Sequence, residues 1–258
     1  MLGYGVSSYF IKHGYNVICP GRNDFDALKQ DAGNLEKFIN QSDLVINCIG
    51  VIKPMIEKNT PLDVLRVNSI FPHNLAKLCK SKNVKLIHVA TDCVYSGKKG
   101  KYNENDYFDA DDLYGISKNG GDGAGCMVLR TSFVGPENGR SRSLLEWAFS
   151  QKGKKVNGFT NHWWNGVSSL YFAEIIEKII NENLYTEGIH HIYSPDTVTK
   201  LELLQIFNRV FGLDLTISPA EAAEKCDRSL ASIYDTSKKV SVKTIESQIA
   251  GLKDFFKL

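Results

Sequence analysis

The sequence has no long hydrophobic run and almost no excess of charge of either sign. Its apolar stretches, such as 44–52, are far shorter than the roughly 20 residues that a membrane-spanning helix needs. The 31 basic and 29 acidic residues are interspersed and give a net charge of +2, which offers no argument for a nucleic-acid or membrane partner. No charged segment followed by an apolar one begins the chain, so we expect no signal peptide.

Paired cysteine motifs are also missing. The six cysteines are scattered, with no CxxC spacing, and several lie in apolar stretches where cysteine behaves as a small hydrophobic residue. We therefore expect reduced thiols in a cytoplasmic protein, with a metal site as the alternative. The adjacent His190 and His191 do not favour that alternative, because neighbours on a strand point to opposite faces.

Apolar segments and helical segments alternate along the chain. Each expected strand is short and rich in Val, Ile, Leu and Cys, and the stretches between them have apolar residues at helical spacing. The expected strands are 15–19, 44–49, 85–90, 126–133 and 189–193. This order predicts an α/β protein with a Rossmann-like, doubly wound parallel sheet and a small C-terminal α/β region.

The expected helices include several with recognisable ends. A helix near the N-terminus has no expected strand before it. The others are 31–41, 61–81 with an interruption at Pro72, 111–119, 143–151, 168–181, 200–211 and 245–256. Asp109 or Asp111 is the expected cap of 111–119, and Gly120 with Gly121 ends it. Asp196 or Thr199 is expected to cap 200–211.

Thr91, Tyr114 and Lys118 are the residues most suited to chemistry. Thr91 ends the expected strand 85–90, and Tyr114 and Lys118 lie four apart in a helical segment, on one face. A cation beside a phenol favours the phenolate and should lower the tyrosine pKa. Such a group can move a proton on or off an oxygen. By itself a Tyr–Lys pair at this spacing is weak evidence, and Thr91 could equally cap its own backbone.

The surrounding segments make the pattern more specific. The chain carries, in order, VINCIG at 45–50, Asn68, PHNLA at 72–76, HVATDCVYSG at 88–97, DLYGISK at 112–118, LRTSFVG at 129–135, SLLEWAFSQ at 143–151, NGV at 165–167 and GIHHIYSPDTVTKLELLQIF at 188–207. Together these segments resemble the extended short-chain dehydrogenase/reductases, and within them the dTDP-4-dehydrorhamnose reductase branch. The resemblance covers nearly the whole chain.

The resemblance implies roles for the three residues and their neighbours. Tyr114 matches the general acid that protonates a carbonyl oxygen, and Lys118 matches the lysine that holds the nicotinamide ribose. Thr91 matches the hydroxyl that hydrogen-bonds the substrate carbonyl, as preorganised donors should. On the same basis, the expected substrate-binding residues are Thr91, Asp92, Cys93 and Phe133.

The expected cofactor is NADPH, with NADH as the alternative. Arg22 follows the expected strand 15–19, where an acidic residue would bind the ribose hydroxyl and an arginine accommodates a 2′-phosphate; a solvated turn arginine is the alternative interpretation. Gly50 permits close backbone approach, or is a plain turn glycine. The expected cofactor-binding residues are Gly3, Arg22, Cys48, Ile49, Gly50, Asn68, Tyr114 and Lys118.

The sequence departs from the family pattern at two glycine-rich places. The family has three glycines between its first strand and helix, and only Gly3 fits, as the last of them. We therefore expect this chain to bind NADPH weakly and to be less stable than a longer version; a low-micromolar affinity would contradict this. The segment 120–125 is short and rich in glycine, so we expect a short catalytic helix with a mobile end.

We accordingly expect an NADPH-dependent reductase acting on the keto group of a nucleotide-activated deoxysugar, in dTDP-L-rhamnose or related surface-polysaccharide precursor synthesis. The alternatives are a 4-keto reductase or epimerase-reductase for another UDP- or GDP-sugar, and a non-catalytic, cofactor-binding regulatory subunit. Residues 1–135, joined by 165–193, form the expected cofactor domain, and 136–164 with 194–258 the substrate region. We expect no nucleic-acid, membrane or metal partner, and leave a homodimer open.

Overall fold

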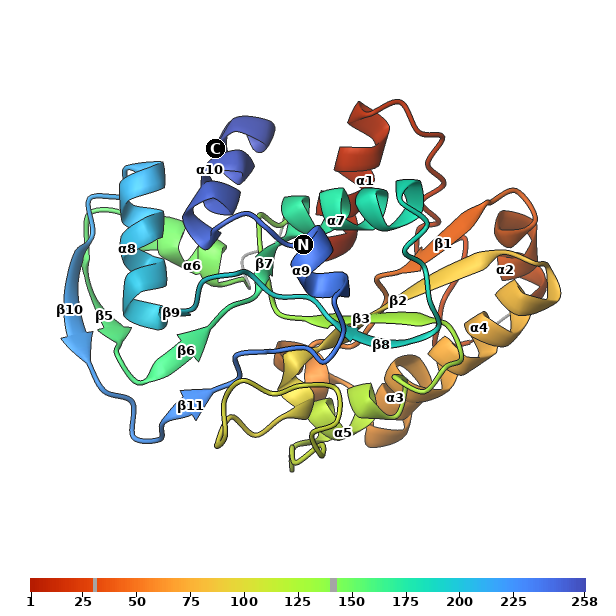
Figure 1. Cartoon of the computed structure of the whole chain (residues 1–258), viewed down its shortest axis with the longest axis horizontal. Coiled ribbons are helices and arrows are strands. Elements are labelled where there is room, and N and C mark those ends of the chain that lie inside the picture. Colours follow the sequence, from red (N-terminus) through yellow and green to blue (C-terminus); the bar gives the residue numbers. More distant parts are fainter. Residues whose placement is uncertain (30–31, 140–142) are drawn as a thin grey trace.

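A four-stranded parallel sheet forms the centre of the molecule (Figure 1). The computed structural model describes residues 1–29, 32–139 and 143–258. The strand order is β1-β2-β3-β8, and all pairings are parallel. The strands are β1 (Leu44–Asn47), β2 (Lys85–Thr91), β3 (Met127–Thr131) and β8 (Gly188–His191). The predicted α/β fold with a parallel sheet is confirmed.

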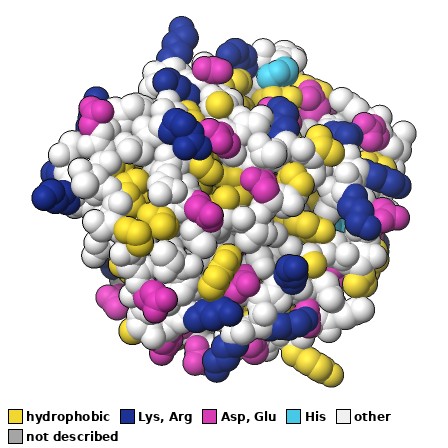
Figure 2. All heavy atoms as spheres, turned by 60° about the vertical axis from the view of Figure 1, so that its left-hand side comes forward, with side chains coloured by type: hydrophobic (Ala, Val, Ile, Leu, Met, Phe, Trp, Pro, Cys, Tyr) yellow, Lys and Arg dark blue, Asp and Glu magenta, His cyan; other side chains and the backbone are white. Residues whose placement is uncertain are grey.

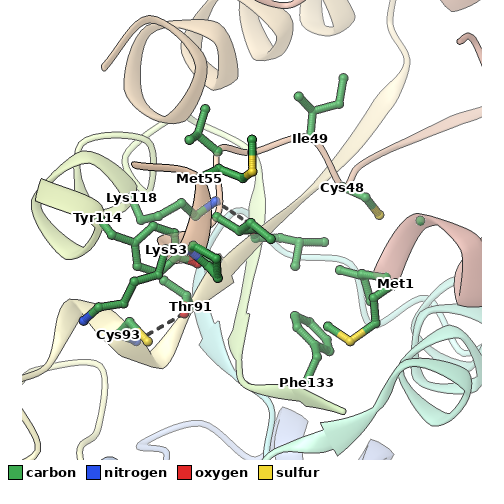
Figure 3. Close-up of a pocket in the computed structure, with 18 of the residues that line it drawn as sticks. Met1, Cys48, Ile49, Lys53, Met55, Thr91, Cys93, Tyr114, Lys118 and Phe133 are labelled. Carbon is green, nitrogen blue, oxygen red and sulfur yellow. Dashed lines mark hydrogen bonds between the residues drawn. The ribbon is translucent and has the colours of Figure 1, made fainter. Parts of the chain in front are cut away.

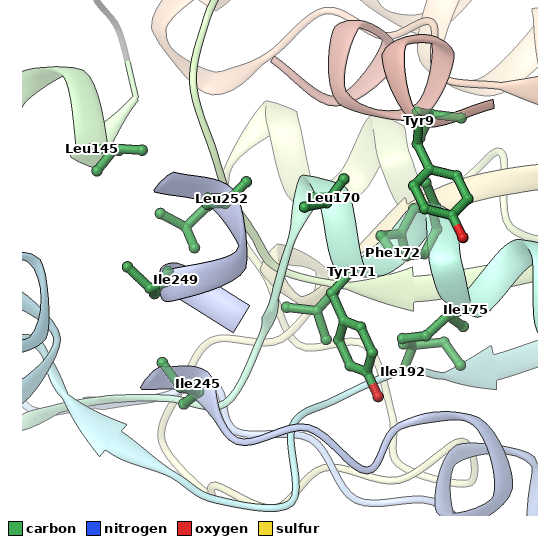
Figure 4. Close-up of a cluster of buried hydrophobic side chains, with 14 of the residues drawn as sticks. Tyr9, Leu145, Leu170, Tyr171, Phe172, Ile175, Ile192, Ile245, Ile249 and Leu252 are labelled. Carbon is green, nitrogen blue, oxygen red and sulfur yellow. The ribbon is translucent and has the colours of Figure 1, made fainter. Parts of the chain in front are cut away.

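Helices cover both faces of this sheet. On one side lie α1 (Leu2–Lys12), α7 (Ser169–Asn181) and α10 (Ile245–Phe256), which bury a large apolar cluster (Figure 4). On the other lie α2 (Ala32–Ile39) and α4 (Phe71–Ser81) with a second cluster. Alternate residues of β2 point to opposite faces of the sheet. Ile87 and Val89 pack in the first cluster, and Leu86 and Ala90 pack in the second.

The C-terminal region builds three small sheets beside the main one. The sheets are β10 with β5, β11-β6-β9, and β4 with β7. The strands are β4 (Phe133–Val134), β5 (Lys155–Phe159), β6 (His162–Trp164), β7 (Val167–Ser168), β9 (Val198–Thr199), β10 (Thr216–Ala220) and β11 (Cys226–Asp227). The helices here are α6 (Leu144–Ser150), α8 (Lys200–Phe211) and α9 (Thr236–Val240). Because β8 pairs with β3, the predicted return of this segment to the main sheet agrees with the strand order, while the domain boundaries stay a prediction.

Helix ends largely follow the sequence signals. Thr199 caps α8 with a capping box, and Thr244 caps α10. The predicted caps of the catalytic helix were wrong: Asp112 caps α5 (Leu113–Asn119) by accepting from the Gly115 amide at 2.8 Å. The Asp109 carboxylate instead accepts a hydrogen bond from the Ser96 amide. Residue 31 of the predicted helix 31–41 lies outside the described residues.

The predicted strand 15–19 was also wrong. The described structure assigns no strand there, and β1 is the last strand at that edge of the sheet. Strand geometry needs a hydrogen-bonded neighbour, and among the described residues none is assigned beside this segment. Tyr15 and Ile18 are correspondingly exposed.

The predicted interruption at Pro72 is present as a change of helix type. α3 (Pro61–Leu65) runs into a π-helical turn, η2 (Arg66–Ile70), and then into α4 with Pro72 in its first turn. Proline donates no amide hydrogen and its ring clashes with the carbonyl four residues before it. A wider π turn accommodates both effects, and it includes Asn68.

The surface seen in Figure 2 carries Lys and Arg side chains interspersed with Asp and Glu. Within the described ranges, no helix combines the length and hydropathy needed to cross a membrane. The remaining short helical segments are η1 (Lys53–Lys58), which follows β1 after a short connection, and η3 (Asp92–Val94), which follows β2 directly. Both lie at the edge of the sheet where the strands end.

Candidate active site

A cavity of about 950 Å³ opens at the carboxyl ends of β1, β2 and β3 (Figure 3). In a parallel α/β sheet this edge is the usual place for a ligand. All but one of the residues predicted for the site line this cavity: Gly3, Arg22, Cys48, Ile49, Gly50, Thr91, Asp92, Cys93, Tyr114, Lys118 and Phe133. The exception is Asn68.

Thr91 ends β2 and is nine-tenths buried. Its hydroxyl donates to Asp92 Oδ1 at 3.2 Å and accepts from the Cys93 amide at 3.2 Å. A side-chain hydrogen bond also joins it to Tyr114. The capping role considered from the sequence is therefore real, because Thr91 begins η3, and the same hydroxyl also contacts the tyrosine.

Tyr114 and Lys118 lie on α5 and point into the same part of the cavity, as Figure 3 shows. Lys118 is buried, and its Nζ donates to the Val89 carbonyl at 3.0 Å. A Cβ added at Gly50 would lie 3.8 Å from that Nζ. The i and i+4 spacing thus places both groups where the sequence predicted.

The expected lowering of the Tyr114 pKa is not found, and that expectation is corrected. Burial raises the pKa of Tyr114, the nearby Cys93 thiol adds to the rise, and the Thr91 hydrogen bond opposes it. Burial lowers the pKa of Lys118, while Asp122 and Cys48 oppose that fall. The lysine ammonium donates to the Val89 carbonyl at 3.0 Å rather than to the phenol. Tyr114 is therefore a fully protonated donor near neutral pH.

The two cysteines of the cavity wall are neutral. Burial raises the pKa of Cys48 and of Cys93 to about 12, and a thiol that stays protonated is a poor nucleophile and a poor metal ligand. These side chains therefore form apolar wall rather than reactive groups.

Asp92 introduces a buried carboxylate beside Thr91. Burial raises the pKa of Asp92, and the cations Arg228 and Lys200 oppose that rise. Arg228 is held by its Nε, which donates to the Tyr95 carbonyl at 2.7 Å. Lys200 begins α8, so the C-terminal region supplies positive charge that acts on Asp92.

The start of α1 and the segment after β1 form one wall of the cavity, the α1–β1 wall. The first residues of α1 line the cavity, and its N-cap, Met1, makes no side-chain capping bond, so free amide groups face it. A Cβ at Gly50 would come within 3.3 Å of Asn68 Oδ1, and one at Gly3 within 3.6 Å of the Cys48 Cβ. Both glycines thus allow close packing within this wall, against Asn68 and Cys48. Arg22 also lines the cavity.

Asn68 stands behind the wall. It is fully buried, accepts from the Val51 amide at 2.8 Å, and donates to the Val51 carbonyl and to Ser117 Oγ, each at 3.0 Å. With these bonds it joins the segment after β1 to α5. The structure therefore places Asn68 behind the α1–β1 wall and outside the cavity lining, and its predicted part in cofactor binding stays a prediction.

Sequence reasoning missed Lys53 and the buried pair Asp122–Arg130. Lys53 lines the cavity and forms an ion pair with the α5 cap, Asp112, at 2.6 Å. Its position in the segment that follows the parallel strand β1 was the available signal. Asp122 and Arg130 pair at 2.7 Å. The sequence features that could have indicated this pair were an aspartate four residues beyond Lys118 and an arginine inside an apolar strand.

Known proteins are similar to this chain over most of its length. A family model described as RmlD substrate binding domain matches residues 1–257. The probable low-salt glycan biosynthesis reductase Agl14 of Haloferax volcanii is 27% identical over 83% of this chain and 78% of its own.

Solved structures share the fold at low sequence identity. The dTDP-4-dehydrorhamnose reductase of Bacillus anthracis, in complex with NADP, superposes with a TM-score of 0.80 at 16% identity, over 99% of this chain and 95% of that one. The Bordetella bronchiseptica enzyme WbmG, in complex with NAD and UDP, gives a TM-score of 0.76 at 15% identity, over 100% of this chain and 92% of that one.

Proposed function

This chain belongs to the RmlD substrate binding domain family of NAD(P)-dependent sugar-nucleotide reductases, and we propose that it reduces the keto group of a nucleotide-activated deoxysugar with NADPH. The observation that carries the proposal is the convergence of Thr91, Tyr114 and Lys118 in one cavity with a glycine-lined wall. The first substrate to test is dTDP-4-dehydro-6-deoxy-L-mannose, whose reduction gives dTDP-L-rhamnose.

The chain's own residues supply the proton and the orientation. Tyr114 donates its proton to the carbonyl oxygen, and its raised pKa keeps that proton in place until the oxygen gains negative charge. The Thr91 hydroxyl, bonded to Tyr114, is positioned to hydrogen-bond the same oxygen. The Lys118 ammonium adds a positive charge beside them in a buried setting.

Residues of the α1–β1 wall would hold the cofactor. Gly3 and the start of α1 would face the pyrophosphate, Cys48, Ile49 and Gly50 would run beside the dinucleotide, and Arg22 would meet a 2′-phosphate. Reduced nicotinamide, when bound, supplies the hydride that the carbonyl carbon accepts. The sugar-nucleotide half would lie toward Phe133, Asp92 and Cys93, which line the rest of the cavity.

The test is NADPH oxidation, followed by absorbance, with dTDP-, UDP- and GDP-linked 4-keto-6-deoxy sugars. We expect turnover with the dTDP-sugar, and none with Tyr114→Phe, which keeps the ring and removes the proton. Turnover only with a UDP- or GDP-sugar would reassign the substrate. Cofactor binding without turnover on any of these sugars would contradict the reductase proposal and favour the non-catalytic alternative.

A further inference from the structure

A buried ion pair lies behind the catalytic helix. Asp122 sits in the turn that follows α5, four residues beyond Lys118, and Arg130 lies in β3. Arg130 Nη2 donates to Asp122 Oδ2 at 2.7 Å, and both side chains are at least 98% buried. Neither residue lines the cavity, so neither has a direct part in the proposed reaction.

Other buried groups fix the arginine in place. Its Nη1 donates to the Tyr95 hydroxyl and to His191 Nε2, each at 2.9 Å. Since His191 Nε2 accepts, its Nδ1 carries the proton and donates to the Ala231 carbonyl at 2.8 Å. Arg130 is therefore anchored to two further elements of the fold and holds Asp122 in a defined position.

Two cations act on the Asp122 carboxylate. The Asp122 amide donates to the Asn119 carbonyl at 3.1 Å, so a helical turn keeps Asp122 close to Lys118, four residues before it. One oxygen is used by Arg130, and the other, Oδ1, is buried without a hydrogen-bond partner among the described residues. The second cation is Lys118, which is also buried. An isolated buried ammonium loses its charge unless an anion compensates for it.

In the part of the chain that the structure describes, no other titratable group near Lys118 provides the compensating negative charge. Tyr114 of α5 keeps its proton, because burial raises its pKa, and Cys48 after β1 has a pKa raised to about 12. His88 of β2 is neutral, since burial and Lys118 both lower its pKa. Within the described residues, Asp122 is the one carboxylate among the groups acting on Lys118.

The carboxylate itself is kept charged by its partners. Burial raises the Asp122 pKa, and Arg130 and Lys118 oppose that rise. A neutral Asp122 would leave Arg130 as an unpaired buried cation, which is the less favourable state.

We propose that Asp122 is a positioning residue for Lys118: fixed by Arg130, its carboxylate is the buried counter-charge that keeps the Lys118 ammonium protonated beside the catalytic tyrosine. The catalytic meaning of this inference rests on the proposed function, but the charge coupling does not. It explains why a carboxylate and an arginine are both buried next to a cavity that neither of them lines.

The test measures the titration of Lys118 in the protein without cofactor. The ¹³Cε resonance of Lys118, assigned by its loss in Lys118→Arg, is followed with pH in the wild type and in Asp122→Asn. We expect the midpoint to fall by about one pH unit or more in the variant, because an attractive charge is removed. The matched control is Glu104→Gln, which removes a half-buried carboxylate that accepts from the His191 amide at 2.8 Å and should leave the midpoint unchanged.

Two further variants cover the case in which Asp122→Asn does not fold. Asp122→Asn/Arg130→Met removes both charges, so no arginine is left unpaired, and Arg130 is not among the groups that act on Lys118. We expect this double variant to keep the lowered midpoint, and Asp122→Glu to return it toward the wild-type value. A wild-type midpoint in a folded Asp122→Asn or double variant overturns the proposal.

Kinetics then separates this inference from the proposed function. With an active reductase, the alkaline limb of kcat/KM for ketone reduction should move to lower pH in Asp122→Asn by the same amount as the Lys118 midpoint. A shifted midpoint with no turnover in any variant, the wild type included, supports the charge coupling and contradicts the reductase proposal alone.

Discussion

Tyr114 combines burial with two polar neighbours of different kinds. Its phenol is hydrogen-bonded to Thr91 and lies in the same cavity as the ammonium of Lys118, which is engaged by the Val89 carbonyl. Such a phenol is a proton donor whose ring also contributes to the packing of the site. Its two contributions can therefore be separated by removing the hydroxyl alone.

Tyr114→Phe is expected to lower kcat for ketone reduction by roughly 10²–10⁴-fold, the usual contribution of a positioned general acid. The thermal unfolding midpoint should stay close to the wild-type value, because the ring remains. Steady-state kinetics and calorimetry on the same preparations measure both. Wild-type turnover in this variant would exclude Tyr114 as the proton donor.

Arg22 is the residue on which the predicted cofactor preference depends. It lines the cavity wall, in a turn rather than at the tip of a strand. Arg22→Ala is expected to weaken NADPH binding by roughly tenfold and NADH binding much less, because a charge-assisted bond to the 2′-phosphate is lost. Arg66→Ala, an exposed arginine outside the cavity lining, is the control in the fluorescence titration. Equal losses for both cofactors would assign Arg22 to a solvated turn.

At the scale of the element, the turn after α5 is packed tightly against the π-helical turn η2. A Cβ at Gly121 would lie 2.3 Å from the Asn68 carbonyl oxygen, and the His73 ring contacts the Gly120 carbonyl at 2.9 Å. The catalytic helix is short, as predicted from the sequence. Its glycine-rich end serves close approach between two helical segments.

Gly121→Ala is expected to lower the free energy of unfolding by about 1–3 kcal/mol, because the added methyl group forces the two segments apart. Gly123→Ala is the matched control, since a Cβ there meets the His73 ring at an ordinary 3.8 Å. Chemical denaturation of both variants gives the comparison. Equal stability of the two would show that the turn relaxes freely around an added methyl.

The sequence predicted the helix ends that are fixed by a capping side chain close in sequence. The bounds of α8 and α10 follow from their apolar spacing and from the caps Thr199 and Thr244. The segment 15–19 has an equally clear strand pattern but forms no strand, because strand formation depends on a neighbour that the pattern cannot supply. Asp112 rather than Asp109 caps α5. This depends on tertiary contacts, because Asp109 accepts from the Ser96 amide and Asp112 pairs with Lys53.

Across the whole molecule, buried histidines tie stability to pH. His191 connects Arg130 to the C-terminal segment, and burial lowers its pKa to about 4, with Glu104 opposing and Arg130 adding to the fall. Burial lowers the pKa of His190 and of His88 as well. The folded protein therefore holds these rings neutral at pH values where the unfolded chain protonates them.

The sign of the effect follows from that difference. As pH falls below about 6.5, the unfolded chain binds protons that the folded protein does not accept until about pH 4. We expect the free energy of unfolding to decrease across this window, with His191 contributing up to about 3 kcal/mol. Urea unfolding at intervals from pH 7 to pH 4 measures it. His191→Gln should flatten this dependence, and an unaltered slope would contradict the assignment.

Sequence alone determined the fold class and the order of most elements, because these follow from periodicity, caps and the geometry of a parallel sheet. The resemblance to a reductase family, carried by motifs of the same sequence, named the residues that would gather at the strand ends. Only the tertiary structure decided the electrostatic state of the site. It placed Lys118 against the Val89 carbonyl, raised the pKa of Tyr114 by burial, and brought Asp122 and Arg130 together behind them. Burial and the distances between charges depend on all the elements at once, so no local pattern in the chain contains them.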